Sequence, residues 1–523
     1  MNSIAAFFDG AVALGSAVVL PAILFIIAIM VGVKFMPALR SSLSVGFILY
    51  GISLIIARFS TLLSEMGTML IERFEVTAFI TDAGRKSTML ITAMSKTGMY
   101  IIMLAIAINL ILLICRVCRT INLDIWSLWV TAFAGAMVES LTGELYMGLI
   151  VASTMYIFTL IVSDTAYKGV EKYCGLPGAT LANSVSASFA PFAKLVCWLL
   201  DLIPTKGRRD ITLGWLKKKI GYLADPAFLS TVFTIIMGLV CRISFSSTLQ
   251  MAVQVGALVF IMPKLMLVLG ESIRPIAAGL ADVSERKFSL RGNLHLGLPA
   301  TCGLGNPTAM LLSLIMVPVT ILLAKLMPNV LYVPTVDFYM MPYVIILIVT
   351  VCHGGLIRSF VSSVVAVTAM LYSSSALAGL FTQALVAADY NTYSTLGLQS
   401  AMYGATPATW ILVKIASFGI AGIGLLAVVV FAMITWNYNR HTGKVKIYVK
   451  RQMELRASSI DEMKEQTLKN KELRTTTVSR KRETLRAAVE VDKAVREVDS
   501  TAAGVEQISI FTTKSEKQSN NKQ

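Results

Sequence analysis

Long apolar runs recur along most of the chain and constrain its fold more than any other feature. Residues 11–33 and 411–434 are two examples that are long enough to cross a bilayer as helices. Hydrophobic residues make up 56% of the 523 residues and charged residues only 15%, a balance that soluble domains rarely have. The sequence therefore predicts an all-α polytopic membrane protein with roughly ten to twelve membrane segments, some of them re-entrant.

Lys and Arg gather at the ends of these runs and indicate how the chain crosses the bilayer. Asp9 precedes the first run, whereas Lys34 and Arg40 follow it, so we expect the N-terminus outside and the Lys34 end in the cytoplasm. This run is too long for the apolar part of a removed signal peptide. The basic loop at residues 201–219 is cytoplasmic by the same rule. The net charge of +16 therefore reflects cytoplasmic loops and tail, and no nucleic-acid partner is expected.

Two stretches are too polar to span a bilayer and too apolar to be ordinary loops. The first, residues 74–96, has Asp82 and Gly84 near its tip, and the second, residues 294–310, is rich in Gly and Pro and contains Asn306. Irregular backbone at membrane depth is tolerated only where protein or a water-filled cavity satisfies its polar groups. One such stretch in each half indicates an inverted repeat with a binding site at the midplane.

A charged turn within residues 116–148 joins two apolar segments. Asn122 or Asp124 can cap the helix that follows this turn. Glu139 lies well inside that helix, where a carboxylate costs several kcal/mol unless it faces protein or water. Because Thr142 lies on the same helical face, we expect both residues to face a substrate cavity. The alternative is a structural bond from Glu139 to a buried basic residue or a backbone amide.

Several motifs resemble the galactitol-type membrane subunit, enzyme IIC, of the sugar phosphotransferase system. They are R-x-x-N-x-D-I-W at residues 119–126, the T-G and M-G that follow, and G-x-x-P-x-T-W at residues 404–410. The resemblance covers about residues 1–440 and is patchy between these motifs. It implies a homodimeric permease of the bacterial inner (plasma) membrane, in which a transport part and a scaffold part are interleaved along the sequence.

The resemblance also assigns polar family motifs to the two irregular stretches. Asp82 and Gly84 match the family's D-x-G, but residues 85–88, Arg-Lys-Ser-Thr, replace its tryptophan, proline and glycine-serine run. In the second stretch the family has I-G-L-D-P-x-x-x-L-G-H-T. Here the aspartate is missing, and Asn306 replaces the histidine.

Two further motifs complete the set of candidate residues. Asn183 stands where the family's P-H-G-T-S has its histidine, and His353 matches the first residue of H-R-G-N-L-F-R-T. His353 can also be a structural anchor at a helix junction. The resemblance and the irregular stretches together suggest as substrate-binding residues Asp82, Gly84, Glu139, Thr142, Asn183, Asn306, Thr308 and His353.

The chain carries no motif for a covalent phosphate carrier. It has no G-x-x-x-x-G-K-[ST] loop, no metal-type cluster and no serine triad, and the lone C-x-x-C of Cys115 and Cys118 is expected only to pack. The resemblance implies that a separate IIB subunit, supplied by IIA, phosphorylates a sugar alcohol held by this chain, which itself needs no cofactor. The resemblance implies that this sugar alcohol is galactitol or a related polyol. A polyol transporter or channel without phosphoryl coupling is the rival function, and a membrane scaffold is a third.

Residues 441–523 differ from the rest because mixed charges replace the apolar runs. A thin apolar stripe that includes Leu485 and Val491 predicts one short amphipathic helix in a largely disordered cytoplasmic tail. A self-association helix or an anchor to anionic lipid are the alternatives. The basic loop at residues 201–219 is either a solvated loop or a docking surface for the soluble phosphotransfer subunits.

Overall fold

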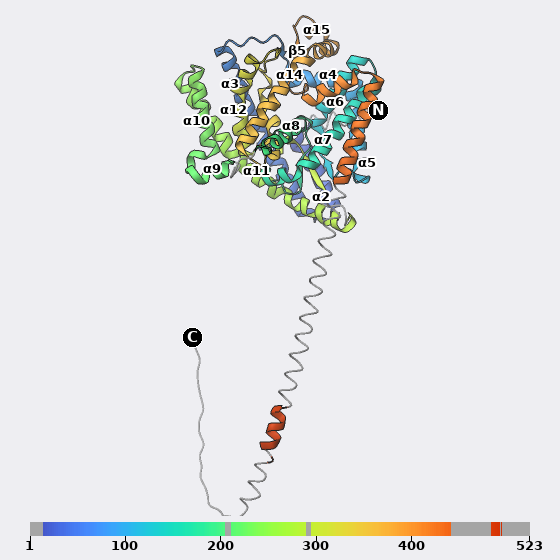
Figure 1. The fold of residues 1–523 in the computed structure, drawn as a ribbon, viewed down its shortest axis with the longest axis vertical. Helices are drawn as coiled ribbons and strands as arrows, with labels where there is room; N and C mark the ends of the chain where they lie inside the picture. The colour runs from blue at the N-terminus through green and yellow to red at the C-terminus, as the bar shows by residue number, and fades with distance from the viewer. Residues whose placement is uncertain (1–13, 204–210, 289–293, 441–482, 492, 494–523) are drawn as a thin grey trace, which may run out of the picture. The chain divides into compact units, whose positions relative to one another are not determined.

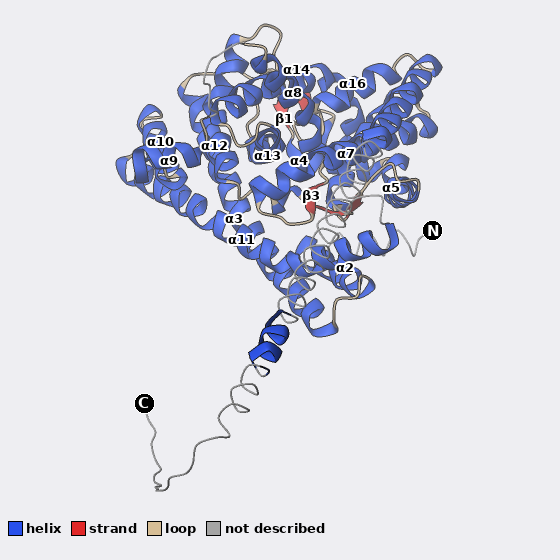
Figure 2. Ribbon diagram, turned by 60° about the horizontal axis from the view of Figure 1, so that its bottom comes forward, coloured by secondary structure: helices blue, strands red, loops and turns tan. Residues whose placement is uncertain are grey.

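The computed structural model describes residues 14–203, 211–288, 294–440, 483–491 and 493. The chain divides into two compact units, Met1–Val445 and Lys446–Gln523. The described part of the first unit is almost entirely helical, with a few very short strands inside it (Figures 1 and 2).

The bounds of the elements are as follows. The helices are α2 (Ser16–Met30), α3 (Phe35–Arg73), α4 (Gly84–Met94), α5 (Lys96–Ile114), α6 (Leu128–Thr142), α7 (Leu145–Cys174), α8 (Ser184–Asp201), α9 (Leu213–Ile220), α10 (Pro226–Val240), α11 (Phe245–Phe288), α12 (Pro307–Leu326), α13 (Met341–Val351), α14 (Leu356–Ala388), α15 (Tyr390–Tyr393), α16 (Pro407–Ala416) and an apolar helix over Ile420–Arg440. The 3-10 helices are η1 (Ile125–Ser127), η2 (Gly221–Ala224), η3 (Ala300–Cys302) and η4 (Asp337–Met340). The strands are β1 (Thr81–Asp82), β2 (Thr120–Asn122), β3 (Ala179–Leu181), β4 (His295–Leu298) and β5 (Gln399–Ser400).

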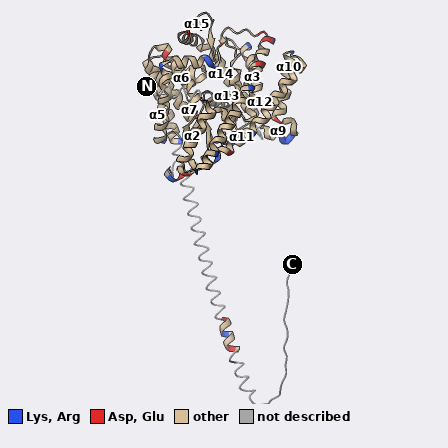
Figure 3. Cartoon of the chain, turned by 180° about the vertical axis from the view of Figure 1, so that it is seen from behind, with Lys and Arg blue, Asp and Glu red and all other residues tan. Residues whose placement is uncertain are grey.

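The described helices confirm an all-α polytopic membrane protein. Eight of them are long and apolar enough to cross a bilayer, and the number is nine if the bent pair α9–η2 and α10 is one span. Three shorter apolar helices, Ser16–Met30, Asp337–Val351 and Pro407–Ala416, add to these. In Figure 3 the backbone segments coloured for Lys, Arg, Asp and Glu lie mostly near the ends of the helices, as burial of the middle parts in lipid requires.

Two helix pairs in different halves of the chain share one design. The 15-residue helices α2 and α10 are each followed by a four-residue link, residues 31–34 or 241–244, and then by the 39-residue α3 or the 44-residue α11. In both pairs one glycine of the long helix, Gly46 or Gly256, lies directly against the short helix. An added Cβ would clash there, so glycine lets the two helices cross closely.

Most of the remaining elements repeat in the same order in the two halves, and α4, α9, η2, η3 and α15 stand outside this match. A short strand (β1 or β4) precedes a long helix (α5 or α12). An extended segment and a 3-10 helix (η1 or η4) come next. Two helices (α6 and α7, or α13 and α14), a strand (β3 or β5) and a last helix (α8 or α16) complete each half. The internal repeat that the two irregular stretches predict is therefore present in the order of elements.

The strands interleave the two halves. β4 of the second half pairs in parallel with β2 and β3 of the first. β1 of the first half pairs in parallel with β5, and Ile80 before it pairs with Tyr332 of the second half. Buried apolar side chains from both halves, such as Phe59, Leu269 and Val344, form the large core around these strands. The irregular stretches are thus held inside the helical body, where their backbone groups have partners.

The tail is described only in small part. Residues 483–491 are helical and exposed. The other predictions for the tail fall on residues 441–482, 492 and 494–523, outside the described residues. The same holds for Asp9 and for residues 204–210 of the basic loop.

Candidate substrate cavity

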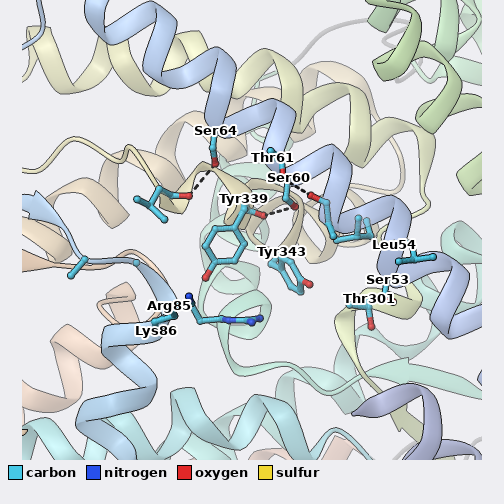
Figure 4. Close-up of a pocket in the computed structure, with 15 residues that line it drawn as sticks. Ser53, Leu54, Ser60, Thr61, Ser64, Arg85, Lys86, Thr301, Tyr339 and Tyr343 are labelled. Atoms are coloured by element: carbon cyan, nitrogen blue, oxygen red, sulfur yellow. Dashed lines mark hydrogen bonds between the residues drawn. The ribbon is translucent and has the colours of Figure 1, made fainter. Parts of the chain in front are cut away.

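A cavity of about 870 Å³ lies between α3 and the turn that joins β1 to α4 (Figure 4). Elements of the second half close it, since η3, η4 and α13 each contribute a residue. Its lining residues are Ser53, Leu54, Ile56, Ala57, Ser60, Thr61, Ser64, Ala83, Gly84, Arg85, Lys86, Thr301, Val336, Tyr339 and Tyr343. Most of its polar groups are hydroxyls.

The α3 wall presents a row of hydroxyl side chains. Ser60 donates to the carbonyl oxygen of Tyr339 at 3.4 Å, and Ser64 donates to that of Val336 at 3.0 Å. Thr61 donates within the helix, to the carbonyl oxygen of Ala57 at 2.9 Å. Each hydroxyl has used its proton in these bonds but keeps lone pairs that can accept a hydrogen bond from a ligand.

Asp82 holds the backbone of the opposite wall in place through hydrogen bonds, although its own side chain does not line the cavity. Its Oδ2 accepts hydrogen bonds from the backbone N–H groups of Thr335, Val336 and Asp337 at 2.9, 2.9 and 2.7 Å. Its Oδ1 accepts from the N–H of Gly84 at 3.0 Å. Burial raises the pKa of Asp82, and these backbone bonds oppose the rise. Asp82 therefore joins a turn of the first half to a loop of the second, and it is not itself a lining residue.

Gly84 lines the cavity at a turn whose backbone conformation favours glycine. Its φ is +66°, a conformation that side chains disfavour, and an added Cβ would lie 3.0 Å from Cγ1 of Val336. The chain therefore turns sharply at Gly84 and begins α4 with Arg85 and Lys86 at the cavity. Figure 4 shows Arg85 extending beneath the rings of Tyr339 and Tyr343.

Glu139 and Thr142 lie away from this lining. Oε2 of Glu139 accepts from the backbone N–H of Thr97 at 2.8 Å and from its hydroxyl at 2.7 Å. Oε1 accepts from the N–H of Lys96 at 3.3 Å. Glu139 thus satisfies the first turn of α5, which is the structural bond to a backbone amide considered above. Thr142 donates to the carbonyl oxygen of Val138 at 2.8 Å, at the end of α6.

Asn183 and Asn306 each stand at the start of a helix. Oδ1 of Asn183 accepts from the N–H of Ser186 at 3.1 Å, so Asn183 caps α8, and its Nδ2 lies 3.4 Å from Oδ2 of Asp124. Asn306 caps α12 in the same way, and its Nδ2 donates to the carbonyl oxygen of Tyr173 at 2.7 Å. Both Asn183 and Asn306 are therefore helix N-caps.

Thr308 and His353 complete the set. Thr308 is buried in the first turn of α12. His353 is exposed in the turn between α13 and α14 with a φ of +55°, and its ring centroid lies 6.2 Å from that of Tyr173. The structure thus brings Asn306 and His353 together at Tyr173, and Asp82 and Gly84 together at the cavity. The eight predicted residues do not form one cluster.

A second, smaller cavity of about 260 Å³ lies beside the R-x-x-N-x-D-I-W motif. Asn122 donates from Nδ2 to the hydroxyl of Tyr156 at 3.1 Å, and Asp124 accepts from the N–H of Ser127 at 3.1 Å, so Asp124 caps η1 as expected. Burial raises the pKa of Asp124 to about 7. Among the described residues no three His, Cys, Asp or Glu side chains are placed to hold a metal ion.

The sequence alone did not single out Arg85, Tyr339, Tyr343 or the α3 hydroxyls as lining residues. Residues 85–88 stood out only as a departure from the family motif. The hydroxyls of Ser53, Ser60 and Ser64 recur at helical spacing on one face of α3, and this was the available signal.

An almost entirely helical membrane body with an internal repeat and a hydroxyl-lined cavity between its halves is typical of a solute permease. The model of the family EIIC-GAT, described as the sugar-specific permease component of the PTS system, matches residues 11–395. The chain therefore belongs to this family, as its motifs predicted.

Two relatives from Escherichia coli (strain K12) show how far the similarity extends. A protein named as a permease IIC component is 25% identical over 437 residues, which cover 84% of this chain and 100% of the relative. The galactitol-specific EIIC component of the PTS system is 26% identical over 435 residues, which cover 83% of this chain and 96% of the relative.

Proposed function

We propose that this chain binds a polyol in the large cavity and carries it across the membrane for phosphorylation by a partner IIB subunit, which a IIA subunit supplies. The observation that supports this most is the lining itself. Ser60, Thr61 and Ser64 on one wall and Tyr339 and Tyr343 on the other can bond a solute rich in hydroxyls. A volume of about 870 Å³ is ample for a hexitol with several waters.

The same lining accounts for selectivity. A cavity that bonds each hydroxyl of its substrate rejects analogues that lack one, because the protein group then stays unpaired. The position of the cavity between α3 and elements of both halves also suits alternating access, in which one bundle moves against another. Galactitol is the first polyol to be tested, since one relative is named for it.

The proposed arrangement in the bacterial plasma membrane follows the charge pattern of the sequence. We place the N-terminus outside and α9, with Lys217, Lys218 and Lys219, in the cytoplasm with the C-terminus. A homodimer is part of the proposal. A single cysteine introduced at Lys217 should be labelled by a membrane-impermeant maleimide only after the cytoplasmic side is opened. Labelling in intact cells would contradict the topology.

Uptake by proteoliposomes tests the transport function. Purified full-length protein is reconstituted with labelled galactitol or other alditols, with and without phosphorylated IIB and IIA of a galactitol system. We expect accumulation of the alditol phosphate only when phosphorylated IIB is present to donate the phosphoryl group, and phosphorylated IIA should increase the yield by recharging IIB. Unmodified accumulation without them would instead establish the uncoupled transporter.

A matched pair of serine variants assigns the transport to the cavity. Ser60→Ala should lower alditol affinity about tenfold, the effect of one lost hydrogen bond. Ser153→Ala, whose hydroxyl donates to the carbonyl oxygen of Leu149 in α7, serves as the control. Equal affinities of the two variants would remove the large cavity as the binding site.

A further inference from the structure

Two cations line the cavity without an acidic partner. Arg85 and Lys86 are both exposed at the start of α4. The ion pairs among the described residues join other side chains, namely Arg58 with Glu65, Lys217 with Asp225, Arg286 with Asp282 and Arg358 with Asp201. The cavity lining given above contains no Asp or Glu.

Asp82 and Asp337 lie behind the cavity wall and form no ion pair with either cation among the described residues. Both oxygens of Asp82 accept backbone hydrogen bonds, as described above. Asp337 is fully buried, and its Oδ2 accepts from the N–H of Tyr403 at 3.1 Å. Its Oδ1 has no hydrogen-bond partner among the described residues. Among the described residues neither carboxylate forms an ion pair with Arg85 or Lys86. Asp337 is near enough to Arg85 for an electrostatic interaction, but it does not bond to the guanidinium.

The start of α4 strengthens the positive character of this wall. The N-terminal end of a helix carries a partial positive charge, and α4 has 11 residues that begin at the cavity. Arg85 and Lys86 add two full charges at the same place. A neutral ligand would displace water from Arg85 and Lys86 without offsetting the cost of their desolvation. An anionic group would offset that cost by pairing with the two charges.

We propose that the substrate of this cavity is a polyol that carries a carboxylate, as an aldonic acid does. The carboxylate pairs with Arg85 and Lys86, and the hydroxyls bond to Ser60, Ser64 and Tyr343. The planar guanidinium of Arg85 suits this role because it can bond both oxygens of one carboxylate. This inference rests on the proposed function, and it specifies the substrate class of the same cavity.

The test compares two ligands that differ at one carbon. Galactitol and galactonate share their stereochemistry, but one has a terminal CH₂OH group where the other has a carboxylate. Binding is measured by calorimetry on full-length protein in nanodiscs of phosphatidylcholine. We expect galactonate to bind at least tenfold more tightly than galactitol, and its affinity alone to fall as salt rises.

Variants assign this difference to the cations. Arg85→Gln should weaken galactonate at least tenfold and galactitol less than threefold, and Arg85→Lys should retain part of the preference. Arg58→Gln is the matched control, because Arg58 lies on α3 but is bonded to Glu65 and Gln254. An unchanged unfolding temperature shows that each variant is folded.

The outcomes separate this inference from the proposed function. Galactitol binding as tightly as galactonate, or an equal loss of both in Arg85→Gln, would overturn the anionic substrate and leave the polyol cavity in place. Binding of neither would overturn both. If phosphatidylglycerol in the nanodiscs competes at Arg85 while galactonate has no advantage, the cations serve a lipid headgroup and the inference is wrong.

Discussion

The internal repeat builds two polar corners that have opposite environments. In the first half, Asp124 precedes η1 and the buried helix α6. In the second half, Asp337 begins η4, which leads into α13. The corner of Asp124 borders the small cavity, whose lining contains no Lys or Arg among the described residues. The 3-10 helix that begins at Asp337 borders the large cavity, where Arg85 and Lys86 lie.

The contrast between the two corners shows that side chains, and not the repeated backbone, set their different environments. Each half supplies a strand that pairs with strands of the other half. The two corners therefore have similar backbone arrangements. The side chains at the turns then decide which corner opens. Asn109, Asn122 and Tyr156 form hydrogen bonds around the first corner, whereas Gly84 and the α3 hydroxyls leave space at the second. Three substitutions test this contrast.

The largest effect is expected at Asp82. Asp82→Ala leaves three backbone N–H groups of residues 335–337 without their acceptor, at about 1–3 kcal/mol each. We expect a loss of roughly 5 kcal/mol of unfolding free energy, seen as a collapse of the folded fraction in detergent. Asp282→Ala, at an exposed pair on α11, should change stability by less than about 0.5 kcal/mol. Similar stability of the two variants would show that Asp82 does not hold the cavity wall.

A pH-dependent effect is expected at Asp124. Burial raises its pKa from 3.8 to about 7 in the folded protein, so between these values the folded state binds more protons than the unfolded state. Stability therefore falls as pH rises from about 4 to about 7 and is level above that. The loss is up to about 4 kcal/mol.

Asp124→Asn should flatten this slope, because asparagine does not ionise. The measurement is the unfolding temperature at a series of pH values, with Asp282→Asn as the control that keeps the wild-type slope. A slope that survives in Asp124→Asn would assign the pH dependence to another group.

The smallest effect is expected at Glu139, which separates a cavity residue from a helix cap. Glu139→Gln removes the charge that accepts from Thr97 and Lys96, so we expect a loss of about 1 kcal/mol of stability and an unchanged polyol affinity. Glu144→Gln, in the next turn, is the control. A weaker polyol affinity at full stability would place Glu139 in the substrate site, as the sequence suggested.

Local features of the fold could be predicted from the sequence. Apolar runs predicted the membrane helices because lipid burial depends on composition over about 20 residues. The N-cap at Asp124 could also be predicted from the sequence, because a capping side chain bonds backbone N–H groups only two or three residues further along the chain. Ser64 lies inside α3, which continues to Arg73, and its side chain borders the cavity and bonds a loop of the second half.

The sequence by itself determined the membrane class, the family and the two irregular stretches. Only the tertiary structure decided which polar residues line the cavity. Asp82 bonds a loop more than 250 residues away, and Ser60 bonds Tyr339 at a separation of 279 residues. Periodicity and motifs report neighbours in the chain, whereas the cavity wall consists of pairs that meet only when the two halves interleave. This is why Arg85 became a candidate for substrate binding only in the folded protein.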